Sequence, residues 1–325
     1  MTEPKRRGFL GCSFPVLIII AVIFLALALL GFMVGPIGQS LLDKFGLDIT
    51  FPSWMNVPSP EPHLPAPELF SIFGLPITNT ILATWITVIF LIILSYVITH
   101  RMKIVPGRLQ VVFEALLGWV FDLCKSVAGD ENGRRFFPVI TTIFLFVLFN
   151  AWLSLIPGYG SIEITVHGHH YELLRGANTD VNTPLAIALV SFVFVALYGL
   201  KDARMGFIRQ YINFGGLFRS IGRVFTGKVK SGLTGVFSGA VDAFVGILEL
   251  LSMFIRIISF TFRLFGNMTA GEILLLVTAF LVPWILALPF YGLELLVGFI
   301  QAFIFSGLTL VFVTMAITPH ESESH

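Results

Sequence analysis

The stretch DAFVGILELLSMFIRIISFTFRLFGNMTAGE, residues 242–272, is mostly apolar and yet contains two arginines. From Ser231 to Pro319 the sequence has no lysine, and its arginines there are Arg256 and Arg263. A guanidinium stays charged in proteins, and at the centre of a bilayer it costs about 2.5–3.5 kcal/mol on insertion scales. Such a charge needs a carboxylate, water or a partner protein. The stretch therefore predicts a membrane helix that takes part in moving charge across the membrane.

Charged residues recur every seven positions in this stretch. They are Asp242, Glu249, Arg256 and Arg263. Because seven residues make two helical turns less about 20°, all four are expected on nearly one face of a helix. Ser259 and Asn267 fall on the same face. The pattern predicts a polar stripe, acidic at one end and basic at the other. Residues seven apart are too distant to pair well, so water or another subunit is expected to fill the stripe.

The composition excludes a soluble domain. Hydrophobic residues make up 56% of the 325 residues and charged residues 12%, and the mean hydropathy is +0.91. These values are typical of a polytopic membrane protein. The two cysteines provide no disulfide framework.

Apolar runs of about 20 residues are long enough to cross a bilayer. The predicted spans are Phe14–Val34, Ile77–Thr99, Phe136–Ile156, Pro184–Leu200 and two spans between about Val236 and Thr318, broken near Pro283 and Pro289. The first run exceeds the 7–15 apolar residues of a usual signal peptide, so we expect an uncleaved anchor. The predicted fold class is all-α: a polytopic membrane protein with about six membrane helices, the last two forming a long tilted hairpin.

The basic residues predict the orientation of these spans. With the N-terminus in the cytoplasm, the tail holds three Lys and Arg residues, the loop 101–135 six and the loop 201–230 seven, whereas the two outer loops hold one each. Basic residues collect in cytoplasmic loops. Both termini are therefore predicted to be cytoplasmic.

Four parts are expected along the chain. They are residues 1–34, a cytoplasmic tail with an extra transmembrane anchor; 35–76, a Pro-rich outer loop; 77–318, the membrane domain; and 319–325, a cytoplasmic tail. The outer loop has eight prolines, which predict an extended segment rather than a packed domain. Val111–Ala128 has apolar residues at helical spacing, which predicts a helix on the cytoplasmic surface. Asn213–Gly239, rich in glycine and basic residues, is left unassigned.

Carboxylates also occur in the last two spans. Glu272 follows Arg263 by nine residues, so it is expected on the opposite helical face, while Glu294 and Gln301 are seven apart and share a face. If the two spans pack antiparallel, Glu272 and Glu294 approach each other. Two carboxylates in a site of low dielectric titrate in two separate steps, which would suit a proton relay.

Simpler interpretations stay open for these residues. Arg256 and Arg263 could be neutralised by glutamates of the same chain as structural contacts. Glu294 could be a buried helix–helix contact, and Gln301 could bond across helices. Asp242 lies near the expected membrane surface and could simply be hydrated.

A histidine cluster and the missing motifs bear on other functions. His167, His169 and His170 could bind metal or collect protons in an outer loop, but a solvated loop is the commoner case. The sequence has no phosphate-binding Gly-rich loop and no His-Glu-x-x-His pair. We therefore expect no catalysis by the chain itself, no metal site and no cofactor. An intramembrane protease would need a pair of aspartates, which the spans lack.

Two segments resemble the signatures of a known family. Residues 259–272, SFTFRLFGNMTAGE, closely resemble the signature of subunit a of F-type ATP synthases, and residues 301–305, QAFIF, resemble its second signature. Weaker matches occur in the expected order at Glu131–Pro138, Leu155–Gly158 and Thr179–Leu185. The resemblance covers roughly Phe70 to Ile317.

The resemblance implies a stator in the membrane motor of an ATP synthase. A bacterial plasma membrane is the simplest expected location, and a plastid or mitochondrial membrane stays open as an alternative. Such a subunit packs its last hairpin against a ring of c subunits, joins the peripheral-stalk subunit b, binds no nucleic acid and offers two proton half-channels. Arg263 matches the essential arginine that faces the ring carboxylate, and Asn267 flanks it. Glu272 and Gln301 match polar residues of the outer channel, and Glu249 matches a carboxylate toward the cytoplasmic exit.

The sequence also departs from the family pattern. Arg256 falls where members often carry a basic residue, but Glu294 stands where some carry histidine. Asn150 lies one position earlier than the usual asparagine. The Phe14–Val34 span, its Pro-rich loop and the Asn213–Gly239 segment exceed the usual plan. The alternative function is a secondary transporter or standalone channel with Arg263 as ion anchor. Such folds often have broken helices in both halves, whereas polar residues here gather in the last two spans.

Overall fold

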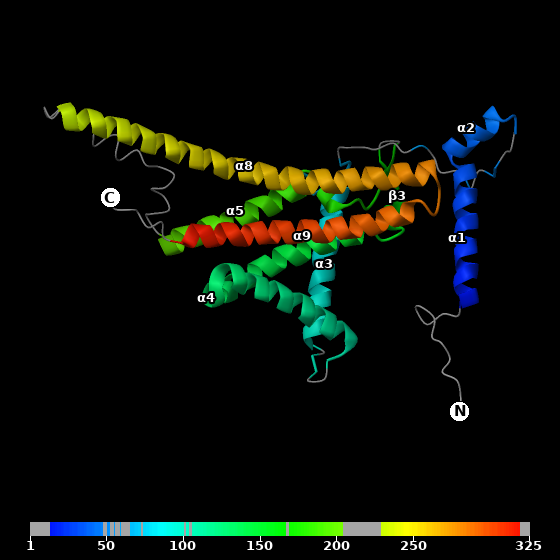
Figure 1. Cartoon of the computed structure of the whole chain (residues 1–325), viewed down its shortest axis with the longest axis horizontal. Coiled ribbons are helices and arrows are strands. Elements are labelled where there is room, and N and C mark those ends of the chain that lie inside the picture. Colours follow the sequence, from blue (N-terminus) through cyan, green and yellow to red (C-terminus); the bar gives the residue numbers. More distant parts are fainter. Residues whose placement is uncertain are drawn as a thin grey trace. The chain divides into compact units, whose positions relative to one another are not determined.

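The computed structural model of the chain describes residues 14–47, 51–52, 55, 59, 66–72, 74–100, 102–103, 106–166, 169–203 and 229–318. Helices dominate these residues (Figure 1). The chain divides into two compact units. The α1 unit, which contains helix α1 (Phe14–Val34), consists of Met1–Leu64 and Thr269–Val297. The α4 unit, which contains helix α4 (Arg108–Ser154), consists of Pro65–Met268 and Gly298–His325.

The long helices follow the predicted apolar runs. Besides α1 and α4, they are α3 (Asn79–His100), α5 (Asn182–Ala203), α8 (Val229–Leu281) and α9 (Ala287–Ile317). Among the described residues, six helices are long and apolar enough to cross a membrane. The prediction of an all-α polytopic membrane protein is confirmed.

The last two helices are longer than one membrane crossing needs. α8 has 53 residues and α9 has 31, which at about 1.5 Å per residue are roughly 80 and 46 Å. A hydrocarbon core is about 30 Å thick. Helices of such length must tilt strongly or extend beyond the bilayer, as expected for a long tilted hairpin.

The Pro-rich stretch has more structure than its composition predicted. It begins with helix α2 (Pro36–Lys44), in which proline occupies a position in the first turn, where its missing N–H costs nothing. It ends in a hairpin of β1 (Glu68–Ile72) and β2 (Leu75–Thr78), which pair antiparallel. Gly74, at φ +80°, permits the turn. The prediction of an extended segment is therefore wrong for α2.

A sharp bend divides α4 into two helical arms. Gly129 has φ 80° and ψ 170°, which is not helical, and it separates the arm that ends at Ala128 from the arm that continues to Ser154. A Cβ at Gly133 would lie 2.8 Å from the carbonyl oxygen of Cys124, so only glycine allows the two arms to meet so closely. The helix predicted over Val111–Ala128 is confirmed, and it lies in the first arm.

The core of the α4 unit is aromatic and aliphatic. Phe136 and Phe144 of α4 are at most 1% exposed. Phe136 meets Tyr198 of α5 edge to face, with ring centroids 5.1 Å apart. At the same end, Arg135 forms a two-pronged ion pair with Asp202, at 2.9 and 3.2 Å. Aromatic packing thus joins α4 to α5, and the ion pair fixes their register.

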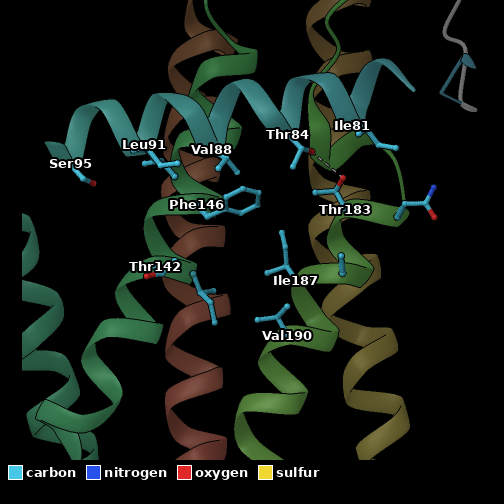
Figure 2. A pocket seen from close by; sticks show the side chains of 14 residues that line it. Ile81, Thr84, Val88, Leu91, Ser95, Thr142, Phe146, Thr183, Ile187 and Val190 are labelled. Carbon is cyan, nitrogen blue, oxygen red and sulfur yellow. Dashed lines mark hydrogen bonds between the residues drawn. The ribbon is translucent and has the colours of Figure 1, made fainter. Parts of the chain in front are cut away.

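An apolar groove of about 740 Å³ lies between α3, α4 and α5 (Figure 2). The side chains of Val88, Phe146 and Ile187 point toward it. Thr84 and Thr183 approach each other at one end, with their hydroxyl oxygens 3.5 Å apart. Its lining contains no charged side chain, so the groove is not suited to conduct ions.

The α1 unit joins α1 and α2 to the turn between α8 and α9. Gly31 of α1 and Gly35, which follows α1, lie directly against the backbone of Pro283 and Leu281. Val34 is only 2% exposed. The rest of α1 is almost wholly exposed and apolar, as a lipid-facing helix should be.

Candidate functional site

The polar stripe of α8 lies along the border between a buried and an exposed face of that helix. On the buried side, Phe260, Leu264 and Met268 are at most 5% exposed, whereas Phe262 on the other side is 58% exposed. α8 is a single helix from Val229 to Leu281. The prediction that the heptad residues share one helix is confirmed.

Arg263 occupies the exposed edge of this stripe in the α4 unit. Within the described part of the chain, no hydrogen bond or ion pair to its guanidinium is found. Ser259, one turn earlier, is also exposed. The hypothesis that a glutamate of the same chain neutralises Arg263 therefore finds no support among the described residues.

Arg256, one heptad earlier, has different surroundings. Its guanidinium carbon lies 3.5 Å from the centroid of the Phe312 ring on α9, a geometry that favours cation–π attraction. Arg256 is half-buried and borders a small cavity together with Ser191 of α5 and Met253 of α8. It is held by its own chain, whereas Arg263 is exposed.

The remaining stripe residues lie between these extremes. Glu249 and Asn267 are half-buried on α8. The backbone of Asp242 lies in α8, but its side chain is outside the described part of the structure. The structure therefore places the predicted stripe in one helix and leaves the role of each residue as a prediction.

Gln301 of α9 belongs to the buried side of the α4 unit. It is 8% exposed, beside Ala302 at 0%. In the described part of the chain its amide has no hydrogen-bond partner. Nearby, Phe305 of α9 packs on Phe260 of α8, with ring centroids 4.8 Å apart. Thus α8 and α9 are in contact here, but no bond across them from Gln301 is seen among these residues.

Glu294 of α9 is the most buried of the candidate carboxylates whose side chains the structure describes. It lies in the α1 unit, is 5% exposed and packs directly against Gly271 of α8, where any added Cβ would overlap the carboxyl group. Antiparallel packing of the last two helices is thus confirmed at this point. Glu272, the next residue on α8, is half-buried.

Two buried polar atoms near this contact lack hydrogen-bond partners among the described residues. They are Oε1 of Glu294 and Oγ1 of Thr269. Buried polar atoms are nearly always bonded to protein or ordered water, and leaving them unpaired costs free energy. The chemistry here suits hydration by water inside the α1 unit.

A cluster of buried polar side chains contains Asn150, which was named from the sequence only for its shifted position, together with residues that were not singled out. Asn150 Nδ2 donates to Asn178 Oδ1 at 3.2 Å. Asn79 Nδ2 donates to a backbone carbonyl of strand β4 (His169–Glu172) at 3.0 Å. Thr80 donates to Asp180 at 3.1 Å. The available signal was the resemblance at Thr179–Leu185, which contains Asp180. This cluster ties α3 and α4 to the segment before α5.

The histidine cluster falls partly outside the described residues. His167 is not described, and His169 and His170 are placed only by their backbone, in β4, which pairs with β3 (Glu163–Val166). A metal or proton-collecting role stays a prediction. Tyr159, just before this hairpin and outside the candidate spans, is half-buried, and burial raises its pKa to about 12. It stays a neutral hydroxyl at physiological pH.

Comparison with known proteins agrees with this geometry. The family described as ATP synthase A chain matches residues 81–314. ATP synthase subunit a of Gloeobacter violaceus is 32% identical over 247 residues, which cover 75% of this chain and 85% of that protein. The family match covers α8 and, as far as residue 314, α9, and so it contains all the candidate residues on these helices.

More distant relatives cover a similar share. ATP synthase subunit a of Geotalea daltonii is 28% identical over 72% of this chain and 86% of its own length. The Helicobacter pylori protein of that name is 26% identical over 73% and 88%. Since the family match spans more than half of the chain and a relative above 30% identity is covered over most of its length, this protein belongs to the family of subunit a of F-type ATP synthases.

Proposed function

We propose that Arg263 separates two proton half-channels of this subunit and faces the carboxylates of a passing ring of c subunits. The chain is a non-catalytic stator subunit of the ATP synthase that takes part in proton translocation. The observation that carries the proposal is the exposure of Arg263, without a partner among the described residues, on a helix that can cross a membrane.

The energetics favour a protein partner for this arginine. Facing lipid would cost about 2.5–3.5 kcal/mol on insertion scales. A carboxylate on another subunit would neutralise the charge and, near Arg263, would be held in its ionised form. Moving one proton charge through 100 mV is worth about 2.3 kcal/mol, so a barrier at Arg263 would prevent that energy from being lost as a leak.

The other polar residues fit two sides of this barrier. We assign Glu272, Glu294 and Gln301 to the outer half-channel, where unpaired buried oxygens support the presence of water. Glu249 is assigned to the cytoplasmic half-channel and Arg256 to a supporting position beside it. In this assignment Asn267 and Ser259 line the edge that faces the ring, and Asp242 lies at the cytoplasmic mouth.

The partners and orientation follow from the same proposal. The exposed edge of α8 would contact the c ring, and the peripheral-stalk subunit b would join the assembly elsewhere on the chain. The uneven distribution of basic residues supports cytoplasmic termini, and a bacterial plasma membrane is the proposed location. A secondary transporter is not favoured, because the whole membrane region from residue 81 matches the subunit a family.

ATP-driven acidification of inverted membrane vesicles tests this proposal. Arg263→Ala should lower pumping about 100-fold, because losing about 3 kcal/mol of charged interaction has an effect of that size on a rate. Passive proton leak should rise, while ATP hydrolysis by the assembled complex should persist.

Leu197→Ala is the control, since Leu197 of α5 is 61% exposed, carries no charge and lies outside the edge of α8 that is assigned to the ring. It should pump nearly as well as the native complex. Pumping that survives Arg263→Ala at the native rate, in a complex shown to be assembled, would disprove the role given to this arginine.

A further inference from the structure

Helix α1 lies outside the part of the chain that matches the family, residues 81–314, and yet it contacts the turn between α8 and α9. Gly31 lies in the last turn of α1, and Gly35, the residue that follows α1, is the N-cap of α2. A Cβ at Gly31 would overlap the carbonyl oxygen of Pro283, and one at Gly35 would overlap that of Leu281. Small residues let helices in membranes approach closely. The contact depends on both glycines.

The turn that α1 contacts has an unfavourable backbone. Trp284 has φ +74° and is the one non-glycine residue with positive φ in the described part of the chain. A bulky residue in this left-handed region costs about 1–3 kcal/mol and persists where its surroundings hold it. Val282 and Ile285 on either side are 9% and 8% exposed. The turn is therefore held by packing rather than by its own preference.

This turn determines how α8 and α9 meet at the buried carboxylate. Glu294 lies seven residues after Ala287, the start of α9, or about 10 Å along the helix. Gly271 lies ten residues before Leu281, the end of α8, or about 15 Å. Since helices are stiff over such lengths, a shift of the turn is transmitted to the contact between Glu294 and Gly271, where a Cβ would not fit.

We propose that α1 is a positioning element of the proton path. Through Gly31 and Gly35 it holds the α8–α9 turn, with Trp284 in its left-handed conformation, and so sets the contact between Glu294 and Gly271. The proposal rests on the proposed function only in assigning Glu294 to the proton path. The positioned residue is Glu294, and α1 itself carries no proton.

The test substitutes the glycines in the assembled complex. Gly31→Leu and Gly35→Leu should each lower ATP-driven pumping about tenfold or more, since misplacing a functional group by about 1 Å can cost 100-fold. They should also change the pH dependence of pumping, because Glu294 moves to different surroundings. Ala26→Leu, which adds the same kind of bulk at an exposed position of α1, should change neither property.

A second substitution keeps the test decisive if α1 is merely needed for folding. Trp284→Gly removes the cost of positive φ, so the turn should depend less on α1. In that background, Gly31→Leu should lower pumping several-fold less than it does alone. Equal losses in both backgrounds, or native pumping and pH dependence in both glycine variants, would overturn the proposal.

These outcomes are independent of the test of Arg263. If Arg263→Ala abolishes pumping while Gly31→Leu has no effect, the proposed function stands and the role of α1 is wrong. If Gly31→Leu alters the pH dependence while Arg263→Ala still pumps, α1 positions Glu294 but the barrier lies elsewhere.

Discussion

The α4 unit and the α1 unit differ in how far their main candidate residues are exposed. In the α4 unit, Arg263 is exposed and, among the described residues, has no partner. In the α1 unit, Glu294 is 5% exposed and packs on Gly271, with one oxygen unpaired in the described part. An exposed charge on a membrane helix is costly in lipid, so a partner protein is expected to cover it. A buried carboxyl oxygen needs a hydrogen-bond partner, which water can provide.

Both residues lie on the same pair of helices, so the difference comes from what packs around them. On α8, the side that carries Leu264 packs into the α4 unit, and Arg263 lies at the edge of that contact. On α9, Glu294 faces a glycine, and the missing side chain leaves room for the carboxyl group. A glycine and a helix edge thus create two distinct environments.

The largest effect is expected when the space beside the Glu294 carboxyl group is filled. Gly271→Leu should abolish most pumping, because the new side chain overlaps the carboxyl group and displaces it from its position. Gly292→Leu on α9 is the control, since a Cβ there has open space. Vesicle acidification measures the effect, and equal pumping by both variants would contradict the contact.

Cysteine labelling tests whether the exposed edge of α8 beside Arg263 becomes covered when the complex assembles. In a chain with Cys12 and Cys124 replaced by alanine, Phe262→Cys should react readily with a maleimide in the isolated subunit, because Phe262 is 58% exposed. In the assembled synthase the rate should fall several-fold if this edge meets the c ring. Leu310→Cys, at a position that is 0% exposed, should label poorly in both. Unchanged labelling of Phe262→Cys on assembly would place the ring elsewhere.

The smallest effect is expected at Arg256, which is half-buried, unlike the exposed Arg263 and the buried Glu294. Arg256→Met keeps an unbranched apolar stem but removes the cation over the Phe312 ring. We expect the free energy of unfolding to fall by about 0.5–2 kcal/mol, the range of cation–π interactions, without a rise in proton leak. Thermal unfolding in detergent and a leak assay measure both quantities. A leak as large as that of Arg263→Ala would show that the two arginines act alike.

Local patterns predicted the helices and missed part of the structure of the Pro-rich region. The apolar runs at Phe14–Val34 and Ile77–Thr99 appear as α1 and α3 with nearly the same bounds, because a run of that length has few other folds in a membrane. The prolines of residues 35–76 predicted an extended segment, but α2 and the β1–β2 hairpin form there. Proline count does not record where in a helix or hairpin each proline falls.

The candidate site likewise has one part that local sequence patterns predict and another that they do not. The heptad from Asp242 to Arg263 could be read from spacing alone, since one helix suffices to align it. Spacing could not predict the stacking of Arg256 on Phe312 or the buried hydrogen bond from Asn150 to Asn178. Each joins residues that are far apart in the chain, and only packing decides such pairs.

Four features could be predicted from the amino-acid sequence without a structure. They are the class of polytopic membrane protein, its long helices, the polar stripe that contains Arg263 and the resemblance to subunit a. All of them depend on local composition, residue spacing and motifs. The tertiary structure alone decided that Arg263 is exposed while Glu294 is buried against Gly271, and that α1 packs through Gly31 on the α8–α9 turn. The physical reason is that exposure and close contact depend on which surfaces meet in three dimensions, and a glycine's missing side chain matters only where another group fills its space.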